Sequence, residues 1–111
     1  MSRLPTHIEV NALIRRVQAE GGFAMVLAKG EVDAGSILIV TLVNQTYAFA
    51  YEKMPSLDGE RHWHRARSFD ADQPDSFEQW LNKRRSSDPD LWIIELDIAD
   101  AERFIGYDGK S

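Results

Sequence analysis

The feature that most constrains the fold of this chain is an apolar, β-branched run at residues 36–43, which reads Ser-Ile-Leu-Ile-Val-Thr-Leu-Val. A run of this composition is typical of a central strand that is covered on both faces. Its uninterrupted apolar part, residues 37–40, is far shorter than the roughly 20 residues that span a bilayer. The sequence therefore predicts a sheet around this strand and no membrane-spanning segment.

The next segment, residues 46–52, alternates between large and small side chains after a predicted tight connection at Asn44-Gln45. In an extended chain, alternate residues lie on opposite faces. One face would carry three aromatic rings and the other two small side chains, namely Tyr47, Phe49 and Tyr51 against Ala48 and Ala50. The small face predicts that a helix packs closely on it. The aromatic face is expected in the core, with a second binding surface as the alternative.

An amphipathic helix is predicted before these strands, because apolar residues recur at helical spacing through residues 10–17. Thr6 and Glu9 have the spacing of a capping box, in which each side chain bonds the backbone amide of the other. Gly21 and Gly22 supply the positive φ angle at which a helix commonly ends. We therefore expect a helix of about four turns that leads into a strand.

A second helix is predicted to begin near Asp75, which has the spacing of a cap to Glu78. Its apolar stripe consists of Phe77, Trp80 and Leu81. Its last turns carry three cations, Lys83, Arg84 and Arg85. Cations suit the last turn of a helix because the dipole is negative there. The helix is expected to end before Pro89.

The remaining segments predict three more strands and the connections between them. Strands are expected at residues 23–28 (buried), 61–67 (with a helix as the alternative) and 91–96. The connections are a hairpin loop at 30–35 and exposed loops at 53–60 and 68–74, and residues 97–105 are expected to form a short helix, with a strand as the alternative. The order is then α-β-β-β-β-α-β, in which the first three strands form a meander.

This order predicts an α+β fold. We expect a single domain over residues 1–105, with a mainly antiparallel sheet of four to five strands packed by two helices. Residues 106–111 are expected to form a flexible tail.

Charge and cysteine content exclude several classes of function. The 111 residues include 13 basic and 18 acidic side chains, a net charge of −5, and no cysteine. Without cysteine the chain has no disulfide, thiolate nucleophile or thiolate metal site. The negative net charge argues against a general nucleic-acid binder, which needs an excess of Lys and Arg. The N-terminus lacks the pattern of a secretory signal, so the expected compartment is the cytoplasm.

A basic stripe with one aromatic ring is the best-motivated candidate binding site. If residues 61–67 are extended, one face carries the four side chains Arg61, Trp63, Arg65 and Arg67. Such a stripe can bind carboxylate or phosphate groups and stack a planar group on the ring. Arg84 and Arg85 would enlarge it if the second helix ends nearby.

Two interpretations of this stripe remain open. In the first, it binds an acidic protein or a small anionic ligand, and the chain is a non-enzymatic binding or interaction module. In the second, its arginines pair internally with carboxylates, above all with those of the acidic C-terminal third, residues 88–108. The sequence fixes neither the oligomeric state nor the identity of a partner.

The pair His62 and His64 is the alternative candidate site. In a strand both imidazoles point to one face, as an H-x-H metal site requires, and both can act as general bases near neutral pH. Candidate third ligands for a metal are Glu52, Asp58, Glu60 and Asp70. The chain would then be a metal-dependent or general acid–base enzyme. The plainer interpretation is an edge strand with two polar histidines, and no cofactor is predicted, because the glycine-rich nucleotide-binding patterns are absent from the sequence.

Three segments carry a resemblance to a known family. They are residues 21–24 with Lys29-Gly30, residues 33–38 (Asp-Ala-Gly-Ser-Ile-Leu), and Arg84-Arg85 followed by residues 88–95 (Asp-Pro-Asp-Leu-Trp-Ile-Ile-Glu). They resemble a bacterial family of short proteins known as domain of unknown function 1491. The resemblance covers nearly the whole chain and implies a single compact bacterial domain. Because the family has no assigned activity, it implies no catalytic or binding residue, and the paired histidines are not part of its pattern.

Overall fold

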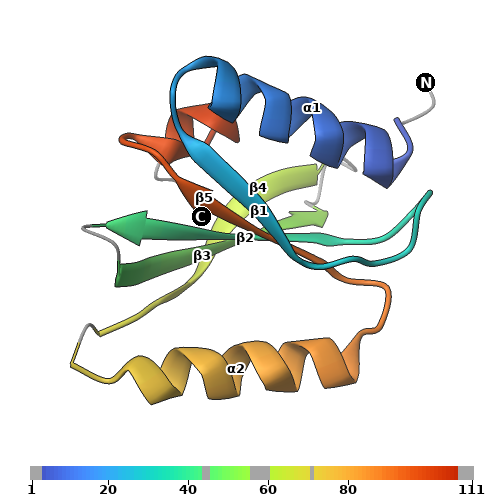
Figure 1. The fold of residues 1–111 in the computed structure, drawn as a ribbon. Coiled ribbons are helices and arrows are strands. Elements are labelled where there is room, and N and C mark those ends of the chain that lie inside the picture. The colour runs from blue at the N-terminus through green and yellow to red at the C-terminus, as the bar shows by residue number, and fades with distance from the viewer. Residues whose placement is uncertain (1–3, 44–45, 56–60, 71, 108–111) are drawn as a thin grey trace.

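Five strands form one mixed sheet, with one α-helix on each face (Figure 1). The computed structural model describes residues 4–43, 46–55, 61–70 and 72–107. The elements are α1 (Thr6–Ala19), β1 (Phe23–Ala28), β2 (Ile37–Val43), β3 (Thr46–Pro55), β4 (Arg61–Ser68), α2 (Pro74–Ser87), β5 (Trp92–Asp97) and the 3-10 helix η1 (Ala101–Phe104). The predicted α+β class, the two helices and the element order are confirmed.

The strands are arranged in the order β1-β5-β2-β3-β4, so β5 lies between β1 and β2. All pairs are antiparallel except β2 with β5, which is parallel. The predicted hairpin of residues 23–28 and 36–43, and with it the three-strand meander, is therefore wrong. The physical reason is burial: Trp92, Ile93, Ile94 and Leu96 of β5 are almost fully buried, which requires a neighbouring strand on each side and cover on each face.

The core lies in two layers, one on each face of the sheet. Alternate residues of β2 face opposite layers: Ile37 and Ile39 pack with α1 and η1, whereas Leu38 and Val40 pack with α2. This confirms the prediction of a central strand that is covered on both faces. Ala50 of β3 packs in the α2 layer, as its small side chain predicted.

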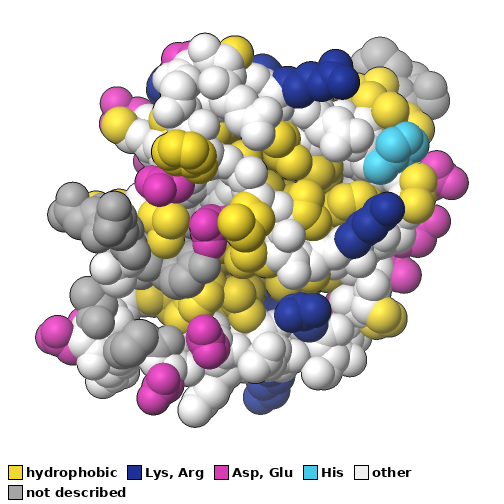
Figure 2. Space-filling view, viewed as in Figure 1, with side chains coloured by type: hydrophobic (Ala, Val, Ile, Leu, Met, Phe, Trp, Pro, Cys, Tyr) yellow, Lys and Arg dark blue, Asp and Glu magenta, His cyan; other side chains and the backbone are white. Residues whose placement is uncertain are grey.

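Strand β1 is an edge strand, and the prediction that it is buried is wrong. It pairs only with β5, and Phe23, Met25 and Val26 remain 74%, 57% and 40% exposed. Hydrophobic side chains gather in this part of the molecule between α1 and α2 (Figure 2). The sequence of an uncharged apolar strand therefore does not distinguish a central strand from an edge strand.

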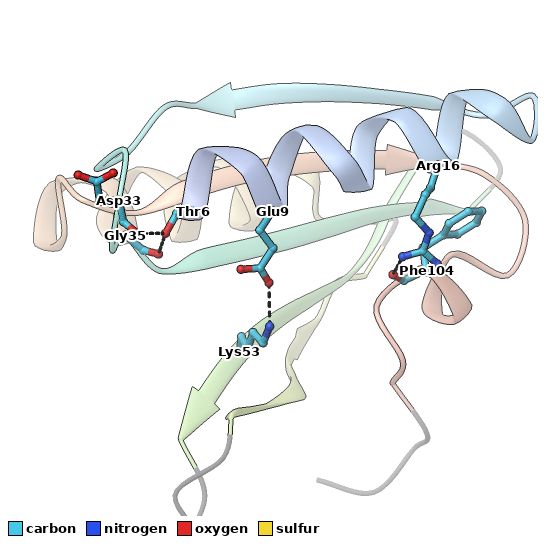
Figure 3. Close-up of polar contacts among 7 residues, drawn as sticks. All are labelled: Thr6, Glu9, Arg16, Asp33, Gly35, Lys53 and Phe104. Carbon is cyan, nitrogen blue, oxygen red and sulfur yellow. Dashed lines mark hydrogen bonds and ion pairs between the residues drawn. The ribbon is translucent and has the colours of Figure 1, made fainter. Parts of the chain in front are cut away.

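The start of α1 does not use the predicted capping box. Thr6 lies within the helix and its hydroxyl bonds the carbonyl oxygens of Asp33 (3.2 Å) and Gly35 (2.9 Å), while Glu9 pairs with Lys53 at 2.7 Å (Figure 3). These long-range partners take both side chains away from the helix terminus. The predicted glycine stop is confirmed by Gly21, whose φ is +86°.

The predicted cap at Asp75 is also wrong, because α2 begins one residue earlier, at Pro74, with Gln73 in the cap position. Proline suits the first turn, since its fixed φ is helical and its missing N–H would have no partner there. The apolar stripe of α2 is confirmed: Phe77 and Leu81 are buried and Trp80 is half-buried.

One connection differs from expectation and another agrees with it. Strand β3 extends to Pro55, so residues 53–55 belong to a strand and not to the predicted loop. The short helix expected within residues 97–105 is present as η1, with Ala101 and Phe104 buried. The predicted turn at 44–45, most of the loop before β4 (56–60) and residues 108–111 lie outside the described residues. Among the described residues, neither helix is long and apolar enough to cross a membrane.

Candidate functional site

A β-bulge at Ala66 divides the predicted basic stripe between the two faces of the sheet. Arg65 lies opposite Tyr51 and Arg67 lies opposite Ala50, so Ala66 is an extra residue without a partner in β3. Tyr51 and Ala50 face opposite core layers, and the same holds for the two arginines. The prediction that residues 61, 63, 65 and 67 share one face is therefore wrong for Arg67.

On the α1 side, the Arg65 guanidinium is held among three aromatic rings. Its Cζ lies 4.1 Å from the ring centroid of Phe49, 5.7 Å from that of Tyr51 and 5.4 Å from that of Tyr107. It also donates to Oε2 of Glu102 at 2.7 Å. The structure thus shows that Arg65 pairs internally with a carboxylate of the acidic C-terminal third.

Tyr51 and Glu102 form the rest of this cluster, because the Tyr51 hydroxyl donates to the same carboxylate oxygen as Arg65. Burial, followed by the hydrogen bond to Glu102, raises the pKa of Tyr51 to about 12. Desolvation acts to raise the pKa of Glu102, but the hydrogen bonds from Tyr51 and Arg65 outweigh it and the pKa is lowered. At neutral pH the phenol is therefore protonated and the carboxylate charged, so neither group can exchange a proton readily there.

A pocket of about 460 Å³ opens beside this cluster. It lies between the C-terminal end of β2 and the chain from β5 into η1, and its lining residues are Thr41, Leu42, Val43, Phe49, Tyr51, Arg65, Asp97, Ile98, Ala99, Asp100, Ala101 and Glu102. Arg16 of α1 contacts the end of η1, since it donates to the Phe104 carbonyl at 3.2 Å and lies 5.6 Å over the Phe104 ring (Figure 3).

On the α2 side, Arg67 and Arg84 approach the same indole ring. Their Cζ atoms lie 5.9 Å and 5.5 Å from the Trp80 centroid, and Arg67 also lies 5.7 Å from the Phe69 centroid. The Phe69 and Trp80 rings are edge to face at 5.5 Å. We call these four residues the Trp80 cluster. Arg84 pairs with Glu52 of β3, whereas Arg67 is exposed and forms no ion pair with any described carboxylate.

The other residues proposed for the stripe are dispersed. Trp63 stays on the α1 side, where Lys53 lies 5.7 Å over its ring. Arg85 lies on the opposite flank of α2 from Arg84, where it lines a separate hollow of about 300 Å³ with Leu27 and Ile93. The Arg61 side chain is outside the described part of the structure. The five described residues of the stripe (Trp63, Arg65, Arg67, Arg84 and Arg85) therefore do not form one site.

The two histidines follow the α2 side of β4, with His64 opposite Glu52. Glu52 is already paired with Arg84, and Asp58 and Glu60 lie outside the described residues. Within the described ranges, no three His, Asp or Glu side chains gather in a way that could hold a metal ion. A metal-dependent or acid–base role for His62 and His64 thus gains no support from the geometry.

Several members of these sites were not anticipated from the sequence. Tyr107 lies in the segment expected to be a tail, yet its ring packs edge to face on Tyr51 at 5.1 Å. Glu102 and Phe69 meet their partners only through long-range packing, so no local spacing marks them. Only the excess of carboxylates after residue 88 pointed toward Glu102.

These features define a small α+β domain with one five-stranded sheet. The model of the family described as "Protein of unknown function (DUF1491)" matches residues 4–106. The chain belongs to this family. No curated protein matches it.

Solved structures with the same fold come from two bacteria. A crystal structure of a DUF1491 family protein from Caulobacter crescentus CB15 is 32% identical, with a TM-score of 0.77, and the match covers 92% of this chain and 94% of that one. An NMR structure of a DUF1491 family protein from the same organism is 30% identical, with a TM-score of 0.77 and full coverage of both chains. The solution structure of protein Atu0922 from A. tumefaciens is 26% identical, with a TM-score of 0.78, and covers 99% of this chain and 98% of that one.

Proposed function

We propose that this protein is a small, non-enzymatic binding module of the cytoplasm that binds an acidic segment of a partner protein on the Trp80 cluster. The observation that carries the proposal is the position of two guanidinium groups over one indole ring, one of them without an ion pair to a described carboxylate.

The charge balance of the cluster favours a carboxylate-bearing partner. Arg67 and Arg84 contribute two positive charges, and Lys83, which follows Trp80 by three residues and is exposed, adds a third on the same side of α2. Glu52 offsets only one of them. Guanidinium groups bind carboxylates through two parallel hydrogen bonds, which gives geometric specificity as well as attraction.

The aromatic rings make the cluster suited to a protein contact. Trp and Arg are the residue types that dominate binding energy at protein interfaces. Stacking on Trp80 and Phe69 holds the Arg67 guanidinium in place before binding, which reduces the conformational entropy lost on association. Cations supplied by two elements, β4 and α2, suit an extended segment with several carboxylates better than a single small anion.

The proposal is tested by titrating the protein with an oligoglutamate peptide and measuring the dissociation constant by calorimetry. Arg67→Gln removes a charge that no carboxylate of the described residues pairs with, from an exposed side chain, and we expect about tenfold weaker binding. Arg15→Gln is the matched control, because Arg15 is an exposed arginine on α1, across the sheet from the cluster. Its dissociation constant should equal that of the parent protein.

Three results would overturn the proposal. If Arg15→Gln weakens binding as much as Arg67→Gln, the attraction is not localised at the cluster. If inorganic phosphate alone competes with the peptide at equal concentration, the site takes a small anion. If a single-stranded DNA oligomer binds more tightly than the peptide and is displaced by salt, the partner is nucleic acid.

A further inference from the structure

We infer that the pocket beside Arg65 binds a small organic cation, with a primary ammonium or guanidinium group on a short apolar body. This site lies on the α1 side of the sheet and is independent of the function proposed for the Trp80 cluster. Its walls come from β2, β3, β4 and the chain from β5 into η1.

The charge that lines the pocket is negative. Asp97, Asp100 and Glu102 are the acidic residues among its lining residues, and Arg65 is the one basic residue. Arg65 is already paired with Glu102, which also accepts the hydroxyl of Tyr51. Asp97 and Asp100 form no ion pair with any residue in the described part of the chain, so the lining keeps an excess of negative charge that attracts a cation.

Thr41 supplies an independent sign that the pocket receives a ligand. Its side chain lines the pocket and is only 4% exposed, yet its hydroxyl forms no hydrogen bond within the described residues. Every fully buried side-chain oxygen or nitrogen of those residues has a partner, so the Thr41 hydroxyl is not fully enclosed, and the pocket is the space that Thr41 lines. A hydroxyl with so little exposed surface makes few bonds to water, and it can accept a hydrogen bond from an N–H group of a ligand.

The remaining walls define the body of the ligand. Leu42, Val43, Phe49 and Ile98 are apolar and suit a short alkyl or small aromatic group. A volume of about 460 Å³ lies in the range of ordinary small-molecule sites. A metal ion is disfavoured, because the described side chains offer no group of three suitable ligands.

The inference is tested by NMR titration of the isotope-labelled protein with n-butylguanidinium chloride, and with sodium butyrate as the anion of similar size. We expect the cation to shift the amide signals of residues 41–43 and 97–102 and to leave the indole signal of Trp80 unchanged. Butyrate should shift none of them. An oligoglutamate peptide should instead shift the indole signal of Trp80 and leave residues 41–43 and 97–102 unchanged. The cation site and the Trp80 cluster are therefore tested independently of each other.

Variants locate the binding. Asp100→Asn removes one charge at a residue with φ of +54°, a conformation that asparagine also adopts readily, so the fold should be kept while the cation binds about tenfold more weakly. Thr41→Val should weaken binding severalfold, and Thr41→Ser should restore it. Asp33→Asn is the control, because Asp33 is exposed near the opposite end of β2.

The inference is overturned if n-butylguanidinium shifts no signal of residues 41–43 and 97–102. It is also overturned if butyrate shifts them equally, or if Asp33→Asn weakens binding as much as Asp100→Asn. Retained affinity in both Thr41→Val and Asp100→Asn would exclude the proposed contacts.

Discussion

At the scale of single residues, Thr6 shows how a long-range partner can displace a local motif. The sequence pattern Thr-x-x-Glu predicts a capping box, but the carbonyl oxygens of Asp33 and Gly35 lie within reach of the hydroxyl. Since Thr6 is only 3% exposed, its hydroxyl fastens the start of α1 to the loop before β2. A local pattern could not predict this contact, because its acceptors lie 27 and 29 residues away.

Replacing Thr6 by valine keeps the shape and removes the hydroxyl. The buried Gly35 carbonyl oxygen then loses this donor, whereas the Asp33 carbonyl oxygen keeps the Thr6 backbone N–H at 3.0 Å. We expect the free energy of unfolding to fall by about 1–3 kcal/mol. Urea denaturation followed by circular dichroism measures this change. Thr6→Ser keeps the hydroxyl donor, so its free energy of unfolding should fall less than that of Thr6→Val. An equal fall in both variants would contradict the role of the hydroxyl.

Tyr51 carries a prediction about high pH. Its pKa is raised to about 12, so between pH 10 and 12 the unfolded chain releases this proton before the folded protein does. The free energy of unfolding should therefore fall over that interval, and fall less in Tyr51→Phe. Phenolate absorbance of the parent protein minus that of Tyr51→Phe should show one phenol with a midpoint near 12. A midpoint near 10 would contradict the buried hydrogen bond to Glu102.

At the scale of elements, the positions of the strands and helices could be predicted from the sequence, but the face of the sheet on which each side chain lies was harder to predict. The predicted strand at residues 61–67 is present as β4, yet counting alternate residues assigns Arg67 to the wrong face. The count assumes a regular strand, and the bulge at Ala66 shifts the pairing by one residue. Nothing in the local composition of β4 marks that bulge, so the division of the basic stripe could not be predicted.

The edge strand β1 and its inner neighbour β5 contribute differently to the stability of the fold. Phe23 of β1 is 74% exposed, so Phe23→Ser should change the free energy of unfolding by only about 0.5 kcal/mol. Ile94 of β5 is fully buried, and Ile94→Ala should cost about 2–5 kcal/mol. Chemical denaturation of both variants tests the assignment. A loss at Phe23 comparable with that at Ile94 would show that β1 is covered.

At the scale of the whole molecule, the sheet order depends on contacts that local patterns do not encode. The sequence predicts where strands occur, but β5 pairs with β1 and β2, which lie far away in the chain. The loop between β1 and β2 passes close to the turn before β5, where Glu31 N–H bonds the Asp90 carbonyl at 3.1 Å. This contact leaves no room for a side chain at Gly30 or Gly35.

Gly35→Ala tests this arrangement. A Cβ at Gly35 would collide with the backbone oxygen of Asp90, and backbone cannot move aside as a flexible side chain can. We expect the free energy of unfolding to fall by about 1–3 kcal/mol, as for other overpacked positions. Ala34→Ser changes an exposed neighbour in the same loop and should cost about 0.5 kcal/mol or less. Equal stability of the two variants would contradict the close approach of this loop to β5.

The fold also determines which charged side chains pair with one another. The acidic C-terminal third neutralises Arg65 through Glu102, and its one arginine, Arg103, pairs with Glu20 of α1 at 2.7 Å. Arg67 lies on the other side of the sheet, beyond the bulge, and has no ion pair with a carboxylate of the described residues. Arg65 is therefore held by internal pairing, and Arg67 is the residue of the stripe that we propose binds the partner.

The different roles of Arg65 and Arg67 are tested by an NMR titration that follows the Nε–H signals of the arginine side chains while an oligoglutamate peptide is added. We predict that the signals of Arg67 and Arg84 shift with the peptide and that the signal of Arg65 does not. A shift at Arg65 with no shift at Arg67 would contradict the account.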